Sequence, residues 1–430
     1  MRTMSTTIFL GFLGCGNIGG GVWHLLHDMH DEILRRDGYD VRVKRALVKS
    51  IPEARTDVPQ EILTENAEDV LNDPEIRIVC EFMGGEQPAA RFMEAALRAG
   101  KTVVTANKMA LSLCWHRLQA AAEEGGSALF YEASVGGVIP IIRSLTVSLE
   151  ADRISQVMGI VNGTTNYILS RMAAEGSDYA DVLRDAQRLG LAEPNPSADV
   201  EGYDSACKLS ILSSIAFHTR VPVKKVYREG ITGITASDIA CGREMGYALK
   251  LLAIGKRRGD TVEVRVHPTF LPVQHPLARV DGSLNAIFVH GDYCQDLMLQ
   301  GRGAGDKPTA SAICGDILYA CRGEKPVAPS FRNTEDADPA LTFTDDWCSR
   351  YFVRLSAHDA PGVLSGVADV FGREGISIAT VLQRGVDEDG RARMILITHE
   401  AHEHAVRRAL SQLNTDTARL VSMIRVEGEA

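Results

Sequence analysis

Short apolar runs alternate with longer segments of mixed polarity over the first third of the chain. Residues 8–13, 41–48, 76–83 and 102–105 are mostly apolar and short enough to be buried strands, whereas residues 88–99 carry apolar positions at helical spacing. Strands that alternate with helices in this way form parallel sheets with helices on both faces. The pattern therefore predicts a doubly wound, Rossmann-like α/β domain at the N-terminus.

The first apolar run ends in a glycine-rich turn, GCGNIG at residues 14–19, which leads into a helical pattern. Glycines allow the backbone to approach a pyrophosphate closely, and the free N–H groups of the following helix stabilise its charge. The motif alone is a weak signal, but the strand before it and the helix after it favour dinucleotide binding over an ordinary turn. The cofactor contacts expected here are Gly14, Gly16, Asn17, Ile18 and Gly19.

The second apolar run ends near Lys49, where NAD-specific proteins usually carry an acidic residue for the ribose hydroxyls. A lysine suits a 2′-phosphate, so the sequence favours NADP, with Arg55 as a second contact and NAD as the alternative. The third and fourth strands end near Gly84 and Thr105, and Lys108 follows shortly after. Ligands on doubly wound sheets lie beyond the carboxyl ends of the strands, so these residues are expected beside the cofactor.

The stretch from residue 186 to residue 208 gathers four ionisable side chains. Two prolines exclude a helix around Glu193 and leave it in a loop. A buried helical pattern then resumes, and on it Asp204 and Lys208 are four residues apart and share a face. A surface ion pair is the ordinary interpretation of this spacing, but the apolar neighbours favour a lysine whose pKa is tuned by nearby carboxylates. Such a lysine is a candidate proton donor.

A polar cluster, NGTTN, follows a predicted strand at residues 154–161 and opens a helix. Hydroxyl groups and free N–H groups at a helix start can hold a carboxylate, whereas helix capping explains only one of the two threonines. Gly163 and Thr164 are therefore candidates for substrate binding. Strands at residues 261–270 and 286–291 complete an α+β substrate domain, whose sheet also offers a dimer surface.

The chain changes character after a second glycine turn at residues 300–305, which returns it to the nucleotide-binding domain. A polar segment without periodicity follows and is interpreted as a linker. The remainder reads strand, helix, strand, strand, helix, strand, which predicts a ferredoxin-like βαββαβ domain.

The histidines at positions 399, 402 and 404 do not have a metal-binding spacing, and a metal site there is discounted. The predicted domains are residues 1–135 with 300–322 for nucleotide binding, 136–300 for substrate binding and dimerisation, 323–348 as a linker, and 349–430 as the C-terminal domain.

A long pattern around the four ionisable side chains carries a family resemblance. It reads Ala, three residues, Gly, then Pro, Asp and Gly-x-Asp-x-x-x-Lys, and it is filled by Ala186, Gly190, Pro196, Asp199, Gly202, Asp204 and Lys208. The chain resembles homoserine dehydrogenases over nearly its whole length. The turn at residues 359–364, together with the βαββαβ order, resembles the ACT domain, which binds amino acids in biosynthetic enzymes.

The resemblance implies a reversible NAD(P)-dependent conversion between L-homoserine and L-aspartate 4-semialdehyde, on the route to threonine, isoleucine and methionine. By the same likeness, Lys208 would donate and accept the proton, and Lys108 would contact the carbonyl group and the cofactor. Asp199 would position a water molecule or the lysine. Glu193 and Asp204 would hold the substrate ammonium group.

The resemblance also implies contacts that the residue pattern does not reveal by itself. Gly190 and Gly305 would approach the cofactor. Residues 129–140 resemble a segment that wraps a monovalent cation, expected to be sodium, with main-chain carbonyl groups. Two adjacent glycines permit a tight curl and oxygen donors suit an alkali ion, although the spacing alone favours an ordinary glycine turn. The implied cation ligands are Glu132, Val135, Gly137 and Ile139.

Composition limits the partners of the chain. With 430 residues it can form two or three domains, and a net charge of −10 without a basic stripe argues against nucleic acid or a membrane surface. Nine cysteines without a C-x-x-C pair are typical of reduced cysteines in a cytoplasmic protein, and no apolar segment is long enough to span a bilayer. We expect a homodimer or homotetramer whose ACT domain binds an amino-acid effector, threonine.

Two other functions remain open at this point. One is a different NADP-dependent amino-acid or semialdehyde dehydrogenase on the same fold, which a substrate profile would distinguish. The other is an amino-acid sensor with an inactive dehydrogenase domain. The complete set of ionisable residues between Glu193 and Lys208 argues against the sensor.

Overall fold

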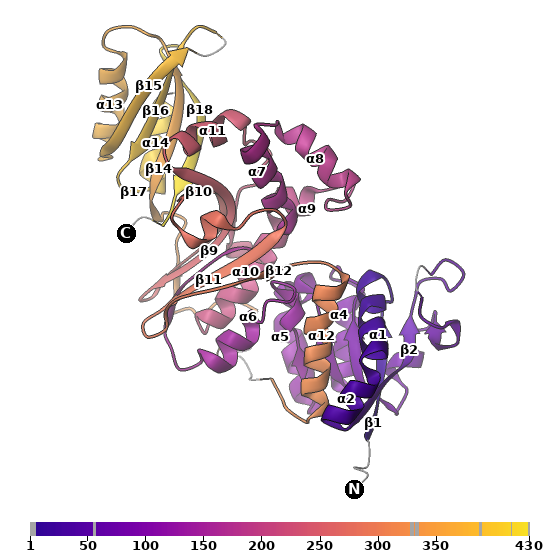
Figure 1. Ribbon diagram of the computed structural model, residues 1–430. Coiled ribbons are helices and arrows are strands. Elements are labelled where there is room, and N and C mark those ends of the chain that lie inside the picture. The colour runs from indigo at the N-terminus through magenta and orange to yellow at the C-terminus, as the bar shows by residue number, and fades with distance from the viewer. Residues whose placement is uncertain are drawn as a thin grey trace.

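The computed structural model describes residues 6–54, 57–326, 331, 335–386, 389–413 and 415–428. Its strands form two sheets, one in the nucleotide-binding part and one that runs through the central and C-terminal parts (Figure 1). The central part lies between the other two. None of the helices in the described residues is both long and apolar enough to cross a membrane.

The first sheet has six strands in the order β3-β2-β1-β4-β5-β6, and every neighbouring pair is parallel. This order has its switch point between β1 and β4, where doubly wound sheets bind their ligands. The prediction of a Rossmann-like parallel sheet is therefore confirmed. The strands are β1 (Thr6–Leu13), β2 (Tyr39–Leu47), β3 (Leu63–Thr64), β4 (Ile76–Glu81), β5 (Thr102–Thr105) and β6 (Leu129–Phe130).

Helices cover both faces of this sheet because its apolar side chains alternate between the two faces. Phe12 packs in the same cluster as Val22 and Ile313 on one face, whereas Leu13 packs in the same cluster as Met93 on the other. Helix α12 belongs to the first face, so the chain does return to this domain. One face carries α1 (Asn17–Asp28), α2 (His30–Asp37) and α12 (Asp306–Cys321), and the other carries α3 (Glu68–Leu71), α4 (Ala89–Arg98) and α5 (Lys108–Gly125).

The central part contributes strands in the order β12-β11-β7-β9-β10, paired antiparallel throughout. Helix α10 packs against β7, β9 and β10 and is buried along nearly its whole length, so its polar side chains must find partners inside the protein. The strands are β7 (Ile154–Ile160), β8 (Tyr227–Arg228), β9 (Tyr247–Arg258), β10 (Thr261–Pro272), β11 (Leu284–Gly291) and β12 (Gln295–Arg302). The helices are α6 (Ile141–Arg143), α7 (Gly163–Glu175), α8 (Tyr179–Arg188), α9 (Ser197–Val200), α10 (Tyr203–Ala216) and α11 (Ala236–Glu244).

The C-terminal part has the predicted βαββαβ order, with its strands arranged β18-β14-β16-β15 and all antiparallel. Buried residues of both helices and the sheet form one cluster, which includes Tyr351, Phe371, Leu396 and Val406. The elements are β14 (Cys348–Ala357), α13 (Val363–Arg373), β15 (Ile378–Val386), β16 (Ala392–Thr398), β17 (Ala401–His402), α14 (Glu403–Leu413) and β18 (Ala418–Val426). Short 3₁₀ or π turns are η1 (Gln60–Ile62), η2 (Glu132–Ser134), η3 (Ser144–Ser148), η4 (Val223–Lys225) and η5 (Pro276–Arg279).

The central and C-terminal parts share one continuous sheet, which the sequence pattern does not reveal. Strand β18 pairs with β10 in parallel, with Phe270 opposite Val426. Within the segment expected to be a linker, β13 (Thr342–Phe343) also pairs with β10, and Trp347 is only 2% exposed. The described end of this segment is therefore packed against the protein.

Ion pairs in which at least one partner is buried reinforce this junction. The guanidinium of Arg354 lies 2.8 Å from Asp238, and that of Arg425 lies 2.8 Å from Glu229. Glu427, just after β18, accepts a hydrogen bond from Lys256 at 2.7 Å. Because a buried charge that loses its partner is strongly destabilising, these pairs fix the C-terminal domain in one position on the central sheet.

Candidate active site

A cavity of about 850 Å³ lies between the first sheet and helix α10. The carboxyl ends of β4 and β5 and the N-terminus of α10 all lie at this cavity. Doubly wound folds bind their ligands at the carboxyl ends of the strands. The structure thus brings together residues that the sequence places far apart. The cavity is lined by Ile18, Gly84, Asn107 and Lys108 from the first domain, and by Glu193, Asp199, Tyr203, Asp204 and Arg228 from the second.

Asp204 lies between two lysines. Its Oδ2 atom accepts a hydrogen bond from Lys208 Nζ at 2.7 Å, and its Oδ1 atom is 3.1 Å from Lys108 Nζ. Lys208 Nζ also donates to the carbonyl oxygen of Val161 at 2.7 Å. Lys108 begins α5 of the nucleotide-binding domain, whereas Asp204 and Lys208 lie on α10, so the cluster exists only where the two domains meet.

The start of α10 explains why a carboxylate is stable there. Gly202 adopts a left-handed conformation, with φ of 78°, and starts the helix so that Asp204 falls in its first turn. The free N–H groups and the dipole at a helix N-terminus favour an anion. Burial raises the pKa of Asp204, but Lys208, Lys108 and a hydrogen bond outweigh burial and hold that pKa well below its usual range. The attraction of Asp204 in turn raises the pKa of Lys108.

Two further carboxylates from the segment before α10 line the same cavity. Asp199, on α9, accepts a hydrogen bond from Asn162 at 2.7 Å, and burial raises its pKa. Glu193 is exposed on the wall of the cavity, and its main-chain carbonyl is held by Gln187 at 3.1 Å. The expected group of Glu193, Asp199, Asp204 and the lysines is therefore assembled around one cavity.

The polar cluster after β7 opens α7, as its sequence predicts. Asn162 is the N-cap residue, and its side-chain oxygen accepts the N–H of Thr165 at 2.9 Å. Gly163 and Thr164 occupy the first turn, and the hydroxyl of Thr164 donates to the carbonyl of Leu191 at 2.7 Å. The helix start is thus tied to the loop that carries Glu193.

Glu81 is a site residue that the sequence argument missed. It ends β4, is completely buried, and accepts hydrogen bonds from the N–H of Met83 at 2.7 Å and from the hydroxyl of Thr105 at 2.7 Å. It also accepts from Gly84 N–H at 3.2 Å and Asn107 Nδ2 at 3.3 Å, although burial raises its pKa. An acidic residue at the end of a buried apolar strand was the available signal, because such a group needs internal partners.

The wall opposite the nucleotide-binding domain contains a second pair that the sequence did not single out. The guanidinium of Arg228 lies 3.3 Å from the ring centroid of Tyr203, and both residues line the cavity. Arg228 also donates to the carbonyl of Glu201 at 2.7 Å. No local pattern connects these positions, since β8 and the start of α10 meet only in the folded chain.

The glycine turn after β1 has the geometry expected of a nucleotide site. Gly14 has φ of 98°, and Gly16 is the N-cap residue of α1. A cavity of about 340 Å³ is lined by Gly16 and Asn17 together with Asp306 at the start of α12. Gly305, with φ of 116°, turns the chain into α12 and so brings the second glycine turn next to the first.

The other residues expected to contact the cofactor lie in different parts of the nucleotide-binding site and its neighbourhood. Lys49 is exposed two residues after β2, whose last residue accepts the N–H of Gly14 at 3.1 Å, so it lies beside the glycine turn. Arg55 lies outside the described residues. Thr105 is fully buried and bound to Glu81, so it supports the strand ends from within. Gly190 is in the turn after α8, with φ of 71°.

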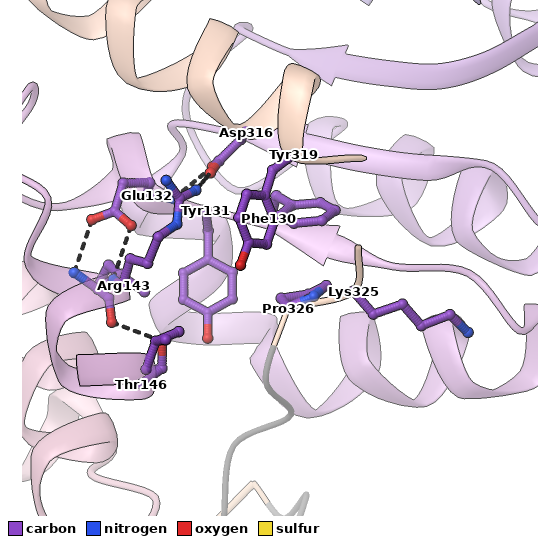
Figure 2. Close-up of a pocket in the computed structure, with 11 residues that line it drawn as sticks. Phe130, Tyr131, Glu132, Arg143, Thr146, Asp316, Tyr319, Lys325 and Pro326 are labelled. Atoms are coloured by element: carbon purple, nitrogen blue, oxygen red, sulfur yellow. Dashed lines mark hydrogen bonds and ion pairs between the residues drawn. The ribbon is translucent and has the colours of Figure 1, made fainter. Parts of the chain in front are cut away.

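The side chain of Glu132, in the segment expected to bind a cation, is occupied by protein contacts (Figure 2). Its two oxygens accept the N–H groups of Ile142 and Arg143, each at 2.9 Å. Arg143 in turn pairs with Asp316 of α12 at 2.6 Å, beside a small cavity of about 50 Å³. Burial raises the pKa of Glu132 to about 7 and that of Asp316 to about 6. This cluster joins the two domains. Because the side chain of Glu132 is occupied, a cation could contact Glu132 only through its main chain.

The main chain of this segment is compatible with cation binding. Gly136 and Gly137 have φ of 75° and 59°, which curls the chain tightly. Val135 and Gly137 are buried, and their carbonyl oxygens accept no hydrogen bond from the described residues. The carbonyl of Ile139, by contrast, accepts the N–H of Ile141 at 2.8 Å. Buried carbonyl groups without a partner suit a hard monovalent ion.

The fold and the site together define a class of enzyme. A parallel sheet with a glycine turn after its first strand binds a dinucleotide, and a lysine-carboxylate cluster faces the same switch point from a second domain. The protein is an NAD(P)-dependent oxidoreductase of the dehydrogenase type.

Comparison with known proteins identifies the family. Family models match residues 14–132 as the NAD-binding domain of homoserine dehydrogenase, residues 140–318 as homoserine dehydrogenase, and residues 351–415 as an ACT domain. The chain is 42% identical over 434 residues to the homoserine dehydrogenase of Corynebacterium glutamicum, covering 98% of this chain and 96% of that protein. It is also 42% identical over 427 residues to that of Mycobacterium tuberculosis, covering 97% of each. The chain belongs to the homoserine dehydrogenase family.

A solved structure agrees with this assignment over the whole chain. The crystal structure of a homoserine dehydrogenase from Thiobacillus denitrificans matches with a TM-score of 0.91 and 38% identity, covering 99% of each chain. The predicted fold class, the family and the C-terminal ACT domain are therefore confirmed.

Proposed function

We propose that this protein interconverts L-homoserine and L-aspartate 4-semialdehyde, as the names of its relatives suggest, in the synthesis of threonine, isoleucine and methionine. The observation that carries the proposal is the Lys108–Asp204–Lys208 cluster, of which Lys108 and Asp204 line the cavity between the nucleotide-binding sheet and α10. A dehydrogenase needs a group that exchanges a proton with the substrate oxygen beside the place of hydride transfer, and this cluster supplies it.

Each lysine has a distinct role in this proposal. When homoserine is oxidised, its hydroxyl proton passes to the neutral amine of Lys208, and the carbon that carries the hydroxyl group releases a hydride. A bound oxidised nicotinamide would accept that hydride. In the reverse direction the Lys208 ammonium returns the proton to the alkoxide. Lys108 polarises the carbonyl oxygen, and its part-exposed side chain reaches the cavity from the cofactor side.

The carboxylates orient the reactants. Glu193 and Asp204 hold the substrate ammonium group, and Asp204 also sets the positions of both lysines. Asp199 positions a water molecule or Lys208. The first-turn N–H groups at Gly163 and Thr164 hold the substrate carboxylate, because helix N-termini favour anions.

The cofactor and a cation complete the proposal. NADP is favoured because Lys49 follows β2 with its side chain exposed beside the glycine turn, with NAD as the alternative. Gly14, Gly16, Asn17, Ile18, Gly19, Gly84, Gly190 and Gly305 would surround the dinucleotide. A sodium ion would bind to the main chain at Glu132, Val135, Gly137 and Ile139, with support from the buried carbonyl groups of Val135 and Gly137.

We also propose that threonine regulates the enzyme through the ACT domain and that the protein acts as a homodimer or homotetramer. A cavity of about 610 Å³ in this domain is lined by His358, Asp359, Asp389, Gly390, Arg391 and Arg419. Two carboxylates and two guanidinium groups there offer partners for both charged groups of a free amino acid.

A turnover assay tests the activity. The purified protein should reduce NADP⁺, and NAD⁺ less efficiently, when homoserine is added, and it should oxidise NADPH with aspartate 4-semialdehyde. A panel of other amino-acid alcohols and semialdehydes is the control for a different substrate. No turnover with homoserine but turnover with another panel member would replace the proposed substrate, and no turnover at all would favour a sensor.

A further inference from the structure

Asn162 joins buried Asp204 and part-buried Asp199 through a single amide nitrogen. Its Nδ2 atom donates to Asp199 Oδ1 at 2.7 Å and to Asp204 Oδ2 at 3.0 Å. The orientation of the amide is fixed, because its oxygen accepts the N–H of Thr165 at 2.9 Å as the cap of α7. Asn162 itself is only 5% exposed.

The amide of Asn162 offsets the repulsion between the carboxylates of Asp199 and Asp204. Two carboxylates that approach each other in a buried site repel, and burial itself disfavours their charge. Asp204 has two lysines to offset this, but among the described residues Asn162 is the only hydrogen-bond donor to the side chain of Asp199. An amide NH₂ group is neutral and carries two N–H donors, so it can serve both carboxylates without adding a charge.

The same stretch of chain also holds the lysine. The carbonyl oxygen of Val161 accepts from Lys208 Nζ at 2.7 Å, and the next residue is Asn162. The end of β7 therefore fixes Lys208 through the main chain and its partner Asp204 through a side chain. A change at Asn162 therefore alters how Asp204 meets Lys208, while the main-chain contact of Lys208 with Val161 remains.

We propose that Asn162 is a positioning residue for the reaction: its amide holds Asp199 and Asp204 at a fixed separation and so aims Lys208 at the substrate oxygen. The inference rests on the proposed dehydrogenase function for its effect on turnover. The bridge between the carboxylates does not depend on that function and can be measured by itself.

Two variants separate the bridge from the helix cap. Asn162→Ser keeps an oxygen that caps α7 but replaces the two N–H donors with one shorter hydroxyl, and Asn162→Asp keeps the same shape but replaces the donors with a third carboxylate. We expect kcat/KM for homoserine to fall by about 10-fold to 100-fold in Asn162→Ser, and further in Asn162→Asp, while Tm of the serine variant changes by a few degrees at most.

The pH profile distinguishes positioning from stability. Besides Asp204, the charged neighbours of Asp199 are Lys208 and Lys108, and both stay in place in the serine variant. Loss of a donor raises the pKa of a carboxyl group, so the acidic limb of kcat/KM should move up by about one pH unit in Asn162→Ser. An unchanged acidic limb, with only a loss of stability, would reduce Asn162 to a helix cap and overturn the proposal.

A measurement without turnover keeps this test independent of the enzyme activity. In protein labelled with ¹³C at the aspartate carboxyl groups, Asp199→Asn identifies the Asp199 signal, and its titration is followed by NMR in the wild type and in Asn162→Ser. A higher pKa for Asp199 in the variant supports the bridge even if homoserine proves to be the wrong substrate. An identical titration in both proteins would refute it.

Discussion

Lys208 Nζ lies 2.7 Å from Asp204 Oδ2, and the other oxygen of the same carboxylate lies 3.1 Å from Lys108 Nζ. Asp204 therefore keeps a cationic partner when either lysine is removed. For that reason, a substitution at Lys208 can remove the proton carrier without leaving a bare buried charge, which would otherwise unfold the site.

The first prediction follows from this arrangement. Lys208→Ala should fold and bind NADP normally but lower kcat by about 100-fold or more, the usual scale of general acid–base catalysis. Lys208→Arg is the matched control, because it keeps the positive charge but cannot release a proton near neutral pH. Both variants should show this loss of kcat in steady-state assays and normal behaviour in cofactor titrations. An active arginine variant would show that the charge, and not proton transfer, is what the reaction needs.

Glu193 should act on binding and not on the chemical step. It is exposed on the cavity wall, away from the hydrogen bonds that hold Lys208. Glu193→Gln removes a charge opposite the substrate ammonium, so KM for homoserine should rise by about 10-fold while kcat falls much less. Initial rates over a range of homoserine concentrations check this. A fall in kcat at unchanged KM would instead assign Glu193 to the chemistry.

Lys49 should determine the preference between the two nicotinamide cofactors. Lys49→Asp places a carboxylate beside the 2′-phosphate, so it should raise KM for NADP⁺ by about 10-fold or more and leave KM for NAD⁺ nearly unchanged. Lys49→Ala, which removes attraction without adding repulsion, should fall between the wild type and Lys49→Asp. Equal losses with both cofactors would place the 2′-phosphate elsewhere.

The sequence predicts most of the fold because each element has a strong local pattern. β5 spans residues 102–105 in both the prediction and the structure, and β1 starts only two residues earlier than expected. The Asp204–Lys208 pair is also predictable, since a four-residue spacing on a buried helix places both side chains on one face. Local pattern is sufficient where the partners lie in the same element.

Relationships between distant segments could not be predicted in the same way. Lys108 meets Asp204 across two domains, and Asn162 reaches Asp199 from the end of another strand. The pairing of β18 with β10 depends on only two residue pairs, and neither strand carries a signal for its neighbour. Such contacts depend on how the elements dock, which hydrophobic periodicity does not determine.

The ion pairs at the ACT junction predict a pH-dependent contribution to stability. Burial would raise the pKa of Glu427, but Arg265 and Lys256 outweigh it and lower that pKa to about 2. A carboxyl group with a lowered pKa stabilises the fold above its unfolded value, about 4.5, and loses that contribution as the pH falls toward 2. Glu427→Gln should therefore cost about 3 kcal/mol of unfolding free energy at pH 7 and less at pH 4. Urea unfolding at both pH values measures this.

Glu400→Gln, at an exposed position of the same domain, is the control for the loss of one negative charge. It should leave the unfolding free energy within about 0.5 kcal/mol of the wild type at both pH values. An equal loss in the two glutamine variants would mean that net charge, and not the buried pairs of Glu427, accounts for the effect.

The last prediction concerns feedback control by threonine, and the junction determines how it must be tested. Deleting the ACT domain would remove β18 from β10 and expose a buried sheet edge, so lost activity in a truncated chain would say nothing about regulation. A point substitution in the ACT cavity avoids this problem. Asp359 is exposed there, and its carboxylate is held by Gln383 at 3.1 Å, a contact that an asparagine oxygen can preserve.

Asp359→Asn should raise the threonine concentration for half-inhibition by about 10-fold and leave the activity without threonine unchanged, because it removes a partner for the effector ammonium and touches no group in the catalytic cavity. A coupling of about 1–3 kcal/mol between the sites is typical of allosteric enzymes, so inhibition of the wild type should be several-fold to a hundredfold at saturating threonine. Isoleucine and methionine serve as controls for specificity. If millimolar threonine, isoleucine and methionine all leave the wild-type rate unchanged, regulation by these amino acids is refuted, and the buried ion pairs at the junction would make the ACT domain a structural support for the central sheet.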